Sequence, residues 1–238
     1  MPYRRLPNTD QARVRALRQA VEKGYSTDVY SMVISLKTYT EARNFLQRFD
    51  AAQDYYRQCY ENQAKSSRKH QNNVKTARLY ISHFIQVLNM SVIRSEIKKA
   101  YKELYGLPPD NYSVPDLISE SSMVEWGSKI IAGENERTSR GGIPIYNPTI
   151  AKVKVHYDIF LDSYNRQKGL QSITNRSLEE LAFMREAADN IILDIWNQVE
   201  KRFQDIHPNE LRLNKCREYG LIYYYRTNEK KKTSDENY

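Results

Sequence analysis

The chain has 238 residues, a formal net charge of +8 and a mean hydropathy of −0.77. A hydrophobic fraction of 40% excludes disorder as the main state, and only 8 Gly and 8 Pro indicate few turns and long elements. No apolar run approaches the roughly 18 residues that span a bilayer, no signal-peptide core is seen, and two cysteines make no disulfide framework, so we expect a cytoplasmic protein.

A short helix is predicted first along the chain. Asn8 and Gln11 have the spacing of a capping box, and Val14, Leu17 and Val21 follow at helical spacing as a narrow apolar stripe. This narrow stripe can attach the helix to a core formed by other elements, but it is too narrow to form a core of its own.

A long helical hairpin is predicted from about Tyr39 to Tyr105. Its first arm carries apolar residues three and four positions apart: Ala42, Phe45, Phe49, Ala52, Tyr56 and Cys59. Its second arm repeats the spacing with Ala77, Ile81, Phe84 and Leu88. The polar segment 66–73 between them is predicted to be the turn of the hairpin.

A crossover, residues 106–147, connects this hairpin to a second one of similar build at about 148–206. Within the crossover, residues 115–132 are predicted to form a short helix, and the polar stretch 133–142 is predicted to be mobile. Asn147 and Pro148 are a favoured helix start, Gly169 is the predicted end of the first arm, and Ser177 with Glu180 caps the second.

Short turns make the two arms of a hairpin antiparallel neighbours. We therefore expect an all-α fold: an up-and-down four-helix bundle built from two repeated hairpins, with an N-terminal helix and a short extended segment near the C-terminus. The predicted organisation is one domain over residues 1–228, including a C-terminal strap at 207–228, and a disordered tail at 229–238. The alternative is that the hairpins form separate subdomains, although no Gly/Ser linker separates them.

The motifs of metal and nucleotide sites are absent from the sequence. A di-iron carboxylate bundle needs Glu-x-x-His pairs, and none of the four histidines has Glu three positions earlier. His83 and His156 are each interpreted either as a ligand or base in the core or as a residue at the edge of an apolar stripe. Cys216 has basic neighbours that favour a lowered pKa, but the sequence places no general base beside it. No catalytic residue, metal ligand or cofactor is predicted.

The distribution of charge is more informative. Residues 62–95 contain no Asp or Glu, and the second predicted turn likewise has cations only. Eight candidate binding residues result: Lys65, Arg68, Lys69, Lys75, Arg78, Arg166, Lys168 and Arg176. In an up-and-down bundle both turns lie at one end. The crossover lies at the other end and is acidic, with Asp110, Asp116, Glu120, Glu125, Glu134 and Glu136. The sequence therefore predicts a basic pole and an acidic pole.

Two interpretations of the basic pole remain open. Cations near the C-termini of the predicted helices, such as Arg68 and Arg166, are explained by the helix dipole. That explanation does not apply to Lys75, Arg78 and Arg176, which lie at predicted N-termini and favour binding of a polyanion or an acidic partner. A second basic feature near the N-terminus comprises Arg4, Arg5, Arg13, Arg15 and Arg18.

The segment Cys216–Leu221, with the aromatic residues and Arg226 after it, resembles the C-terminal segment of uncharacterised bacterial helical-bundle proteins with duplicated hairpins. The helix start at Asn147 and Pro148 is similar too. The resemblance implies a bundle fold and the bacterial cytoplasm, and it implies no activity or ligand.

Three hypotheses for function follow, in order of preference. The first is a non-catalytic interaction protein, an adaptor or assembly component that binds a protein partner or a second copy of itself. The second is a nucleic-acid-binding accessory protein that uses the basic pole. The third is an enzyme or small-ligand carrier with a site between the hairpins. None of them involves a membrane.

Overall fold

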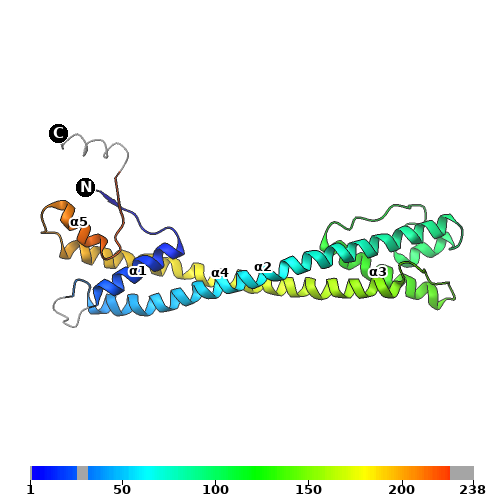
Figure 1. Ribbon diagram of the computed structural model, residues 1–238, viewed down its shortest axis with the longest axis horizontal. Coiled ribbons are helices and arrows are strands. Elements are labelled where there is room, and N and C mark those ends of the chain that lie inside the picture. The colour runs from blue at the N-terminus through cyan, green and yellow to red at the C-terminus, as the bar shows by residue number, and fades with distance from the viewer. Residues whose placement is uncertain (1, 26–31, 226–238) are drawn as a thin grey trace. The chain divides into compact units, whose positions relative to one another are not determined.

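The computed structural model describes residues 2–25 and 32–225, and the part described is all-α apart from one short strand pair (Figure 1). The predicted tail at 229–238 lies outside the described residues. None of the described helices is both long and apolar enough to cross a membrane. The elements are β1 (Tyr3–Arg4), α1 (Asp10–Gly24), α2 (Leu36–Ile93), the 3-10 helix η2 (Lys99–Tyr105), α3 (Glu120–Ser139), α4 (Ile150–Arg202), α5 (Asn209–Arg217) and β2 (Tyr223–Tyr224).

The predicted first hairpin is wrong, because α2 is a single helix of 58 residues that runs through the expected turn. Segment 66–73 is polar but contains no Gly or Pro to end a helix. The buried face also continues through it in phase, since His70 and Val74 lie seven and three residues before buried Ala77. A polar composition was therefore mistaken for a turn.

The second hairpin is wrong for the same reason, because α4 is a single helix of 53 residues. Gly169 lies inside it, where an added Cβ would meet nothing within 4 Å. Thr174 and Ser177 are buried in the helix interior, so Ser177 caps no helix. With both turns absent, the predicted four-helix bundle of repeated hairpins does not form.

The chain divides into two compact units, and each takes part of both long helices. The terminal unit comprises Met1–Gln58 and Asn175–Tyr238. Its core gathers α1, the first part of α2, the last part of α4 and α5 around buried Leu17 and Trp196. Arg13 on α1 reinforces this packing with hydrogen bonds of 2.8 and 2.9 Å to the carboxylate of Asp189 on α4.

The central unit comprises Cys59–Thr174 and packs α3 and η2 against α2 and α4. Its core is apolar and includes Ile81, Phe84, Met123 and Phe160, all fully buried. Gly127 allows α3 to approach α4 closely, because an added Cβ there would lie 2.3 Å from the ring of Tyr157. The stretch 133–139, predicted to be mobile, is instead the last part of α3.

The aromatic segment near the C-terminus forms strand β2, as the extended-strap prediction allowed. It pairs antiparallel with β1, Tyr3 opposite Tyr224 and Arg4 opposite Tyr223. The hydroxyl of Tyr223 donates to Glu200 on α4 at 2.7 Å. The pairing of β1 with β2 thus holds both ends of the described chain on the terminal unit.

Replacing Gly169 with Ala tests the continuity of α4. Inside an exposed helix, Ala in place of Gly is expected to raise the free energy of unfolding by about 0.5–1 kcal/mol. Urea denaturation measures the change. The control is Gly106→Ala, which is expected to destabilise by about 1 kcal/mol because Gly106 has φ 69° at the end of η2. A lower free energy of unfolding for Gly169→Ala would contradict a continuous α4 and would indicate that the helix ends in a turn at Gly169.

Candidate functional site

Five of the eight cations predicted to bind a partner are exposed and have neither a carboxylate nor an aromatic ring as a partner among the described residues. They are Lys65, Arg68, Lys69, Lys75 and Arg166. All five belong to the central unit. Four of them lie on α2, at positions 65, 68, 69 and 75, and fall within about 120° of one another around that helix.

The other three predicted cations are engaged. Arg78 donates to the carbonyl oxygens of Leu117 and Ile118, both at 2.9 Å, and so holds the segment before α3. Lys168 lies over the ring of Tyr164 at 4.8 Å. Arg176 pairs with Glu180 and belongs to the terminal unit. The structure therefore does not bring all eight residues into one site.

The position of the five free cations excludes the helix dipole as their explanation. The effect of the dipole falls off within the first and last turns of a helix. Arg68 and Arg166 lie several turns inside α2 and α4, far from the C-terminal ends of these helices at Ile93 and Arg202. Their positive charge therefore serves neither ion pairing nor helix stability.

A hollow of about 240 Å³ lies between α2 and α4 of the central unit, and we call it the cationic groove. Lys69 and Arg166 line it from facing helices, and Asp162 is the acidic residue of its lining. The remaining lining residues are Ser66, His70, Asn73, Ile159 and Ser163. Cations, hydroxyl groups and an amide together supply hydrogen-bond donors suited to an oxyanion.

His70 is buried beneath this groove and was missed at the sequence level, because it fell in the expected turn. Its Nδ1 lies 2.8 Å from the hydroxyl of Ser163, which donates in turn to the carbonyl of Phe160. Its Nε2 lies 3.0 Å from Glu120 on α3, without the alignment of a hydrogen bond. His70 thereby connects the groove to the first turn of α3. The in-phase continuation of the apolar stripe is the signal that would have found it.

The predicted acidic pole is also corrected, because each of its six carboxylates has a local partner. Asp110 pairs with Lys99, Glu125 with Lys129, Glu136 with Arg140, Glu134 with Arg137 and Glu120 with His70, and Asp116 accepts from the backbone of Ile118. Lys or Arg side chains therefore compensate four of the six carboxylates of the crossover, those of Asp110, Glu125, Glu134 and Glu136. In the N-terminal basic run, Arg4, Arg13 and Arg18 are likewise paired with carboxylates.

The other sequence candidates carry no chemistry in the structure. His83 is exposed, and His156 stacks on the ring of Tyr80 with centroids 4.1 Å apart. Both cysteines are free and buried, and burial raises the pKa of the Cys216 thiol despite its basic neighbours. Among the residues described, no group of His, Cys, Asp and Glu is placed to hold a metal ion.

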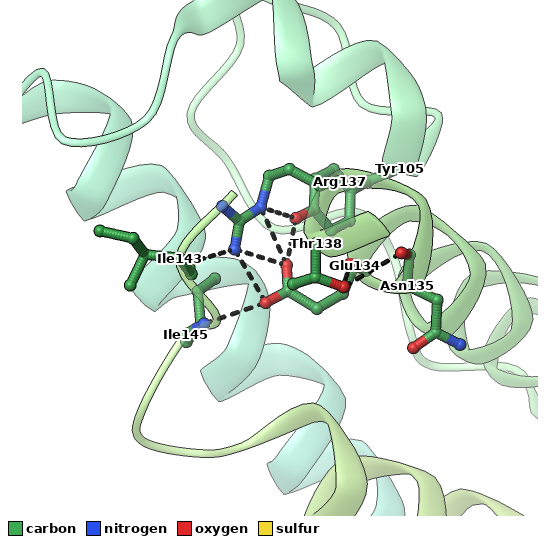
Figure 2. Close-up of polar contacts among 7 residues, drawn as sticks. All are labelled: Tyr105, Glu134, Asn135, Arg137, Thr138, Ile143 and Ile145. Carbon is green, nitrogen blue, oxygen red and sulfur yellow. Dashed lines mark hydrogen bonds and ion pairs between the residues drawn. The ribbon is translucent and has the colours of Figure 1, made fainter. Parts of the chain in front are cut away.

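A second polar site lies at the end of α3, where Glu134 is fully buried (Figure 2). Its carboxylate accepts from the hydroxyl of Tyr105, from Arg137 at 2.8–3.0 Å and from the backbone N–H of Ile145 at 2.9 Å. Burial and this hydrogen bond raise the pKa of Tyr105, so the phenol remains a donor. Burial lowers the pKa of Arg137, but its bonds to Tyr105 and Glu134 outweigh this effect.

Arg137 also donates to the carbonyl of Ile143 at 2.9 Å, so the ion pair holds the loop 140–147 at two backbone positions. This loop walls a cavity of about 660 Å³ beside the C-terminal end of α2. Ile143 and Tyr146 project from the loop with 84% and 90% of their surfaces exposed. A rigid loop thus borders the cavity.

No protein-family model matches the chain, and neither the curated proteins nor the solved structures searched include a significant match.

The buried ion pair is expected to dominate the local stability. Arg137→Met leaves Glu134 buried without its charge partner, so we expect a loss of about 3–5 kcal/mol of unfolding free energy. Arg140→Met, which removes the exposed pair with Glu136, is the matched control and is expected to lose less than about 1 kcal/mol. Urea denaturation checks both, and equal losses would contradict the assignment.

Proposed function

We propose that this chain is a non-catalytic interaction protein of the bacterial cytoplasm, and that its cationic groove binds the phosphate backbone of a nucleic acid. The observation that carries the proposal is the set of five exposed cations that have neither a carboxylate nor an aromatic ring as a partner. Neither ion pairing nor the helix dipole accounts for them. Cations that form no ion pair leave a local positive potential that attracts a polyanion, and the groove lining holds two cations against the single carboxylate of Asp162.

The chemistry of the groove favours nucleic acid over an acidic protein. The centre of a protein interface is usually apolar and aromatic, whereas Ile159 is the apolar residue among the groove's eight lining side chains. Phosphate oxygens, by contrast, are bound by Arg, Lys, Ser and Asn side chains, and all four types line the groove. Lys65, four residues before Lys69 on α2, places one further cation beside the groove.

The pattern of these contacts indicates binding without sequence recognition. The side chains that line the groove are of the kinds that contact phosphate oxygens, and such contacts carry no sequence information. We therefore expect similar affinity for different sequences and a strong dependence on salt. The free thiols of Cys59 and Cys216 are consistent with a reducing compartment.

Salt titration tests the proposal. Binding of a fluorescent single-stranded oligonucleotide is measured by anisotropy between 50 and 300 mM NaCl. Each lost phosphate contact lowers the log–log salt slope by about 0.7. The triple variant Lys65→Gln, Lys69→Gln, Arg166→Gln is therefore expected to lower the slope by about two and to weaken binding.

The control is Arg94→Gln, Lys129→Gln, Lys154→Gln, which removes equal charge from cations of the central unit that are already paired with carboxylates. It is expected to change the slope far less than the groove variant. Equal effects of the two variants would show that binding depends on net charge alone, and would contradict the assignment of the groove as the binding site. Absence of binding by the unmodified chain, with retention of an acidic protein instead, would favour the adaptor hypothesis.

A further inference from the structure

The cavity bordered by loop 140–147 has the size of a small-molecule site. Its volume of about 660 Å³ lies within the roughly 300–1,000 Å³ typical of ligand pockets. Val87, Ile97, Tyr101 and Ile145 supply an apolar part of the lining, and Ser91 and Lys98 supply polar groups. An apolar chamber with a few polar groups suits an amphipathic ligand.

Arg137 provides the observation that identifies the polar end of that ligand. A guanidinium has five N–H groups, and those on Nε and Nη2 reach Tyr105, Glu134 and the carbonyl of Ile143. Figure 2 shows the third nitrogen, Nη1, without a dashed line, and no acceptor for it is found among the described residues. Two donors of a side chain that is only 3% exposed are thus left over.

The unused donors lie at the cavity wall. An ideal Cβ on Gly142 would lie 2.7 Å from Nη1, so Nη1 stands directly behind this glycine. Gly142 and Arg137 both line the cavity. Because Gly142 has no side chain, an oxygen atom inside the cavity has access to Nη1. Nη1 is not among the fully buried polar atoms that lack a partner, so water in the cavity reaches it, and a ligand oxygen can take the place of that water.

The charges around the cavity specify an acidic acceptor. Lys98 is exposed, lines the cavity and has no carboxylate partner in the described part of the chain. Glu96, which also lines it, faces Arg94 at 3.8 Å, and Arg140 is paired with Glu136. Glu134 already compensates the charge of Arg137, so Lys98 is the cation available for a ligand.

We propose that this cavity binds a small amphipathic carboxylate. One carboxylate oxygen accepts from Nη1 of Arg137, Lys98 compensates the charge, and the apolar body lies against Val87, Ile97 and Tyr101. The assignment is independent of nucleic-acid binding, because Arg137 and Lys98 are not part of the cationic groove.

Isothermal titration calorimetry of the full chain with 4-phenylbutyrate tests the proposal, with 4-phenylbutyramide as the uncharged analogue. The acid is expected to bind at least about tenfold more tightly than the amide. No heat of binding up to about 10 mM acid, or equal affinity for acid and amide, would overturn it.

Two variants that leave the Arg137–Glu134 pair intact locate the site. Ser91→Phe fills the cavity and is expected to abolish binding while circular dichroism and thermal melting show a folded chain. Lys98→Gln is expected to weaken the acid several-fold and leave the amide unchanged. Lys129→Gln, a cation paired with Glu125 outside the cavity lining, is the control and is expected to bind the acid normally. Normal binding of the acid by Ser91→Phe would contradict the assignment.

Discussion

The buried carboxylate of Glu134 fixes the positions of three segments of the central unit, which non-directional apolar packing alone does not do. It accepts hydrogen bonds from η2 through Tyr105, from α3 through Arg137 and from the following loop through the N–H of Ile145. Arg137 adds two further connections, from Nε to the hydroxyl of Tyr105 and from Nη2 to the carbonyl of Ile143. A buried charge is tolerated only when its bonds are satisfied, so the geometry around Glu134 is narrowly defined. The loop 140–147 and the orientation of the Arg137 guanidinium follow from it.

The second constraint is the continuity of α2 and α4 through polar sequence. In the central unit the seam between them carries His70, Ser163 and Gln167 where an ordinary helix pair carries aliphatic side chains. Cations that hairpin turns would have placed at helix ends lie instead on helix sides. There they are neither paired with carboxylates nor stabilised by a helix dipole. The predicted fold suggested a binding surface because it gathered these cations at one end of a bundle. The observed fold suggests one because the same cations lie unpaired along the sides of helices.

The helical class and the phase of the buried faces could be predicted from sequence, because spacings of three and four residues persist from Phe45 to Leu88. The helix boundaries were mispredicted at segment 66–73 and at Gly169, since polar composition was given more weight than unbroken phase. The buried positions of His70 and Val74 continue the phase of Ala77 and Ile81, so the signal was present. A single glycine without a following proline was likewise too weak a stop.

The candidate sites were less predictable. The free cations were identified, but Arg78 could not be separated from them, because its partners are the carbonyls of Leu117 and Ile118 about forty residues away. The sequence assigns Glu134 to the acidic pole and gives no signal for Arg137. Only the fold shows that Tyr105 and the loop backbone enclose them. Long-range hydrogen bonds of this kind leave no local pattern in a sequence.

Ultraviolet cross-linking of the full chain to an oligonucleotide, with the adducts mapped by mass spectrometry, tests the central claim most directly. The account predicts adducts in the peptides that carry Lys65, Lys69 and Arg166, and their loss at high salt. Adducts confined to the N-terminal arginines, of which Arg4, Arg13 and Arg18 are already paired with acids, would contradict it.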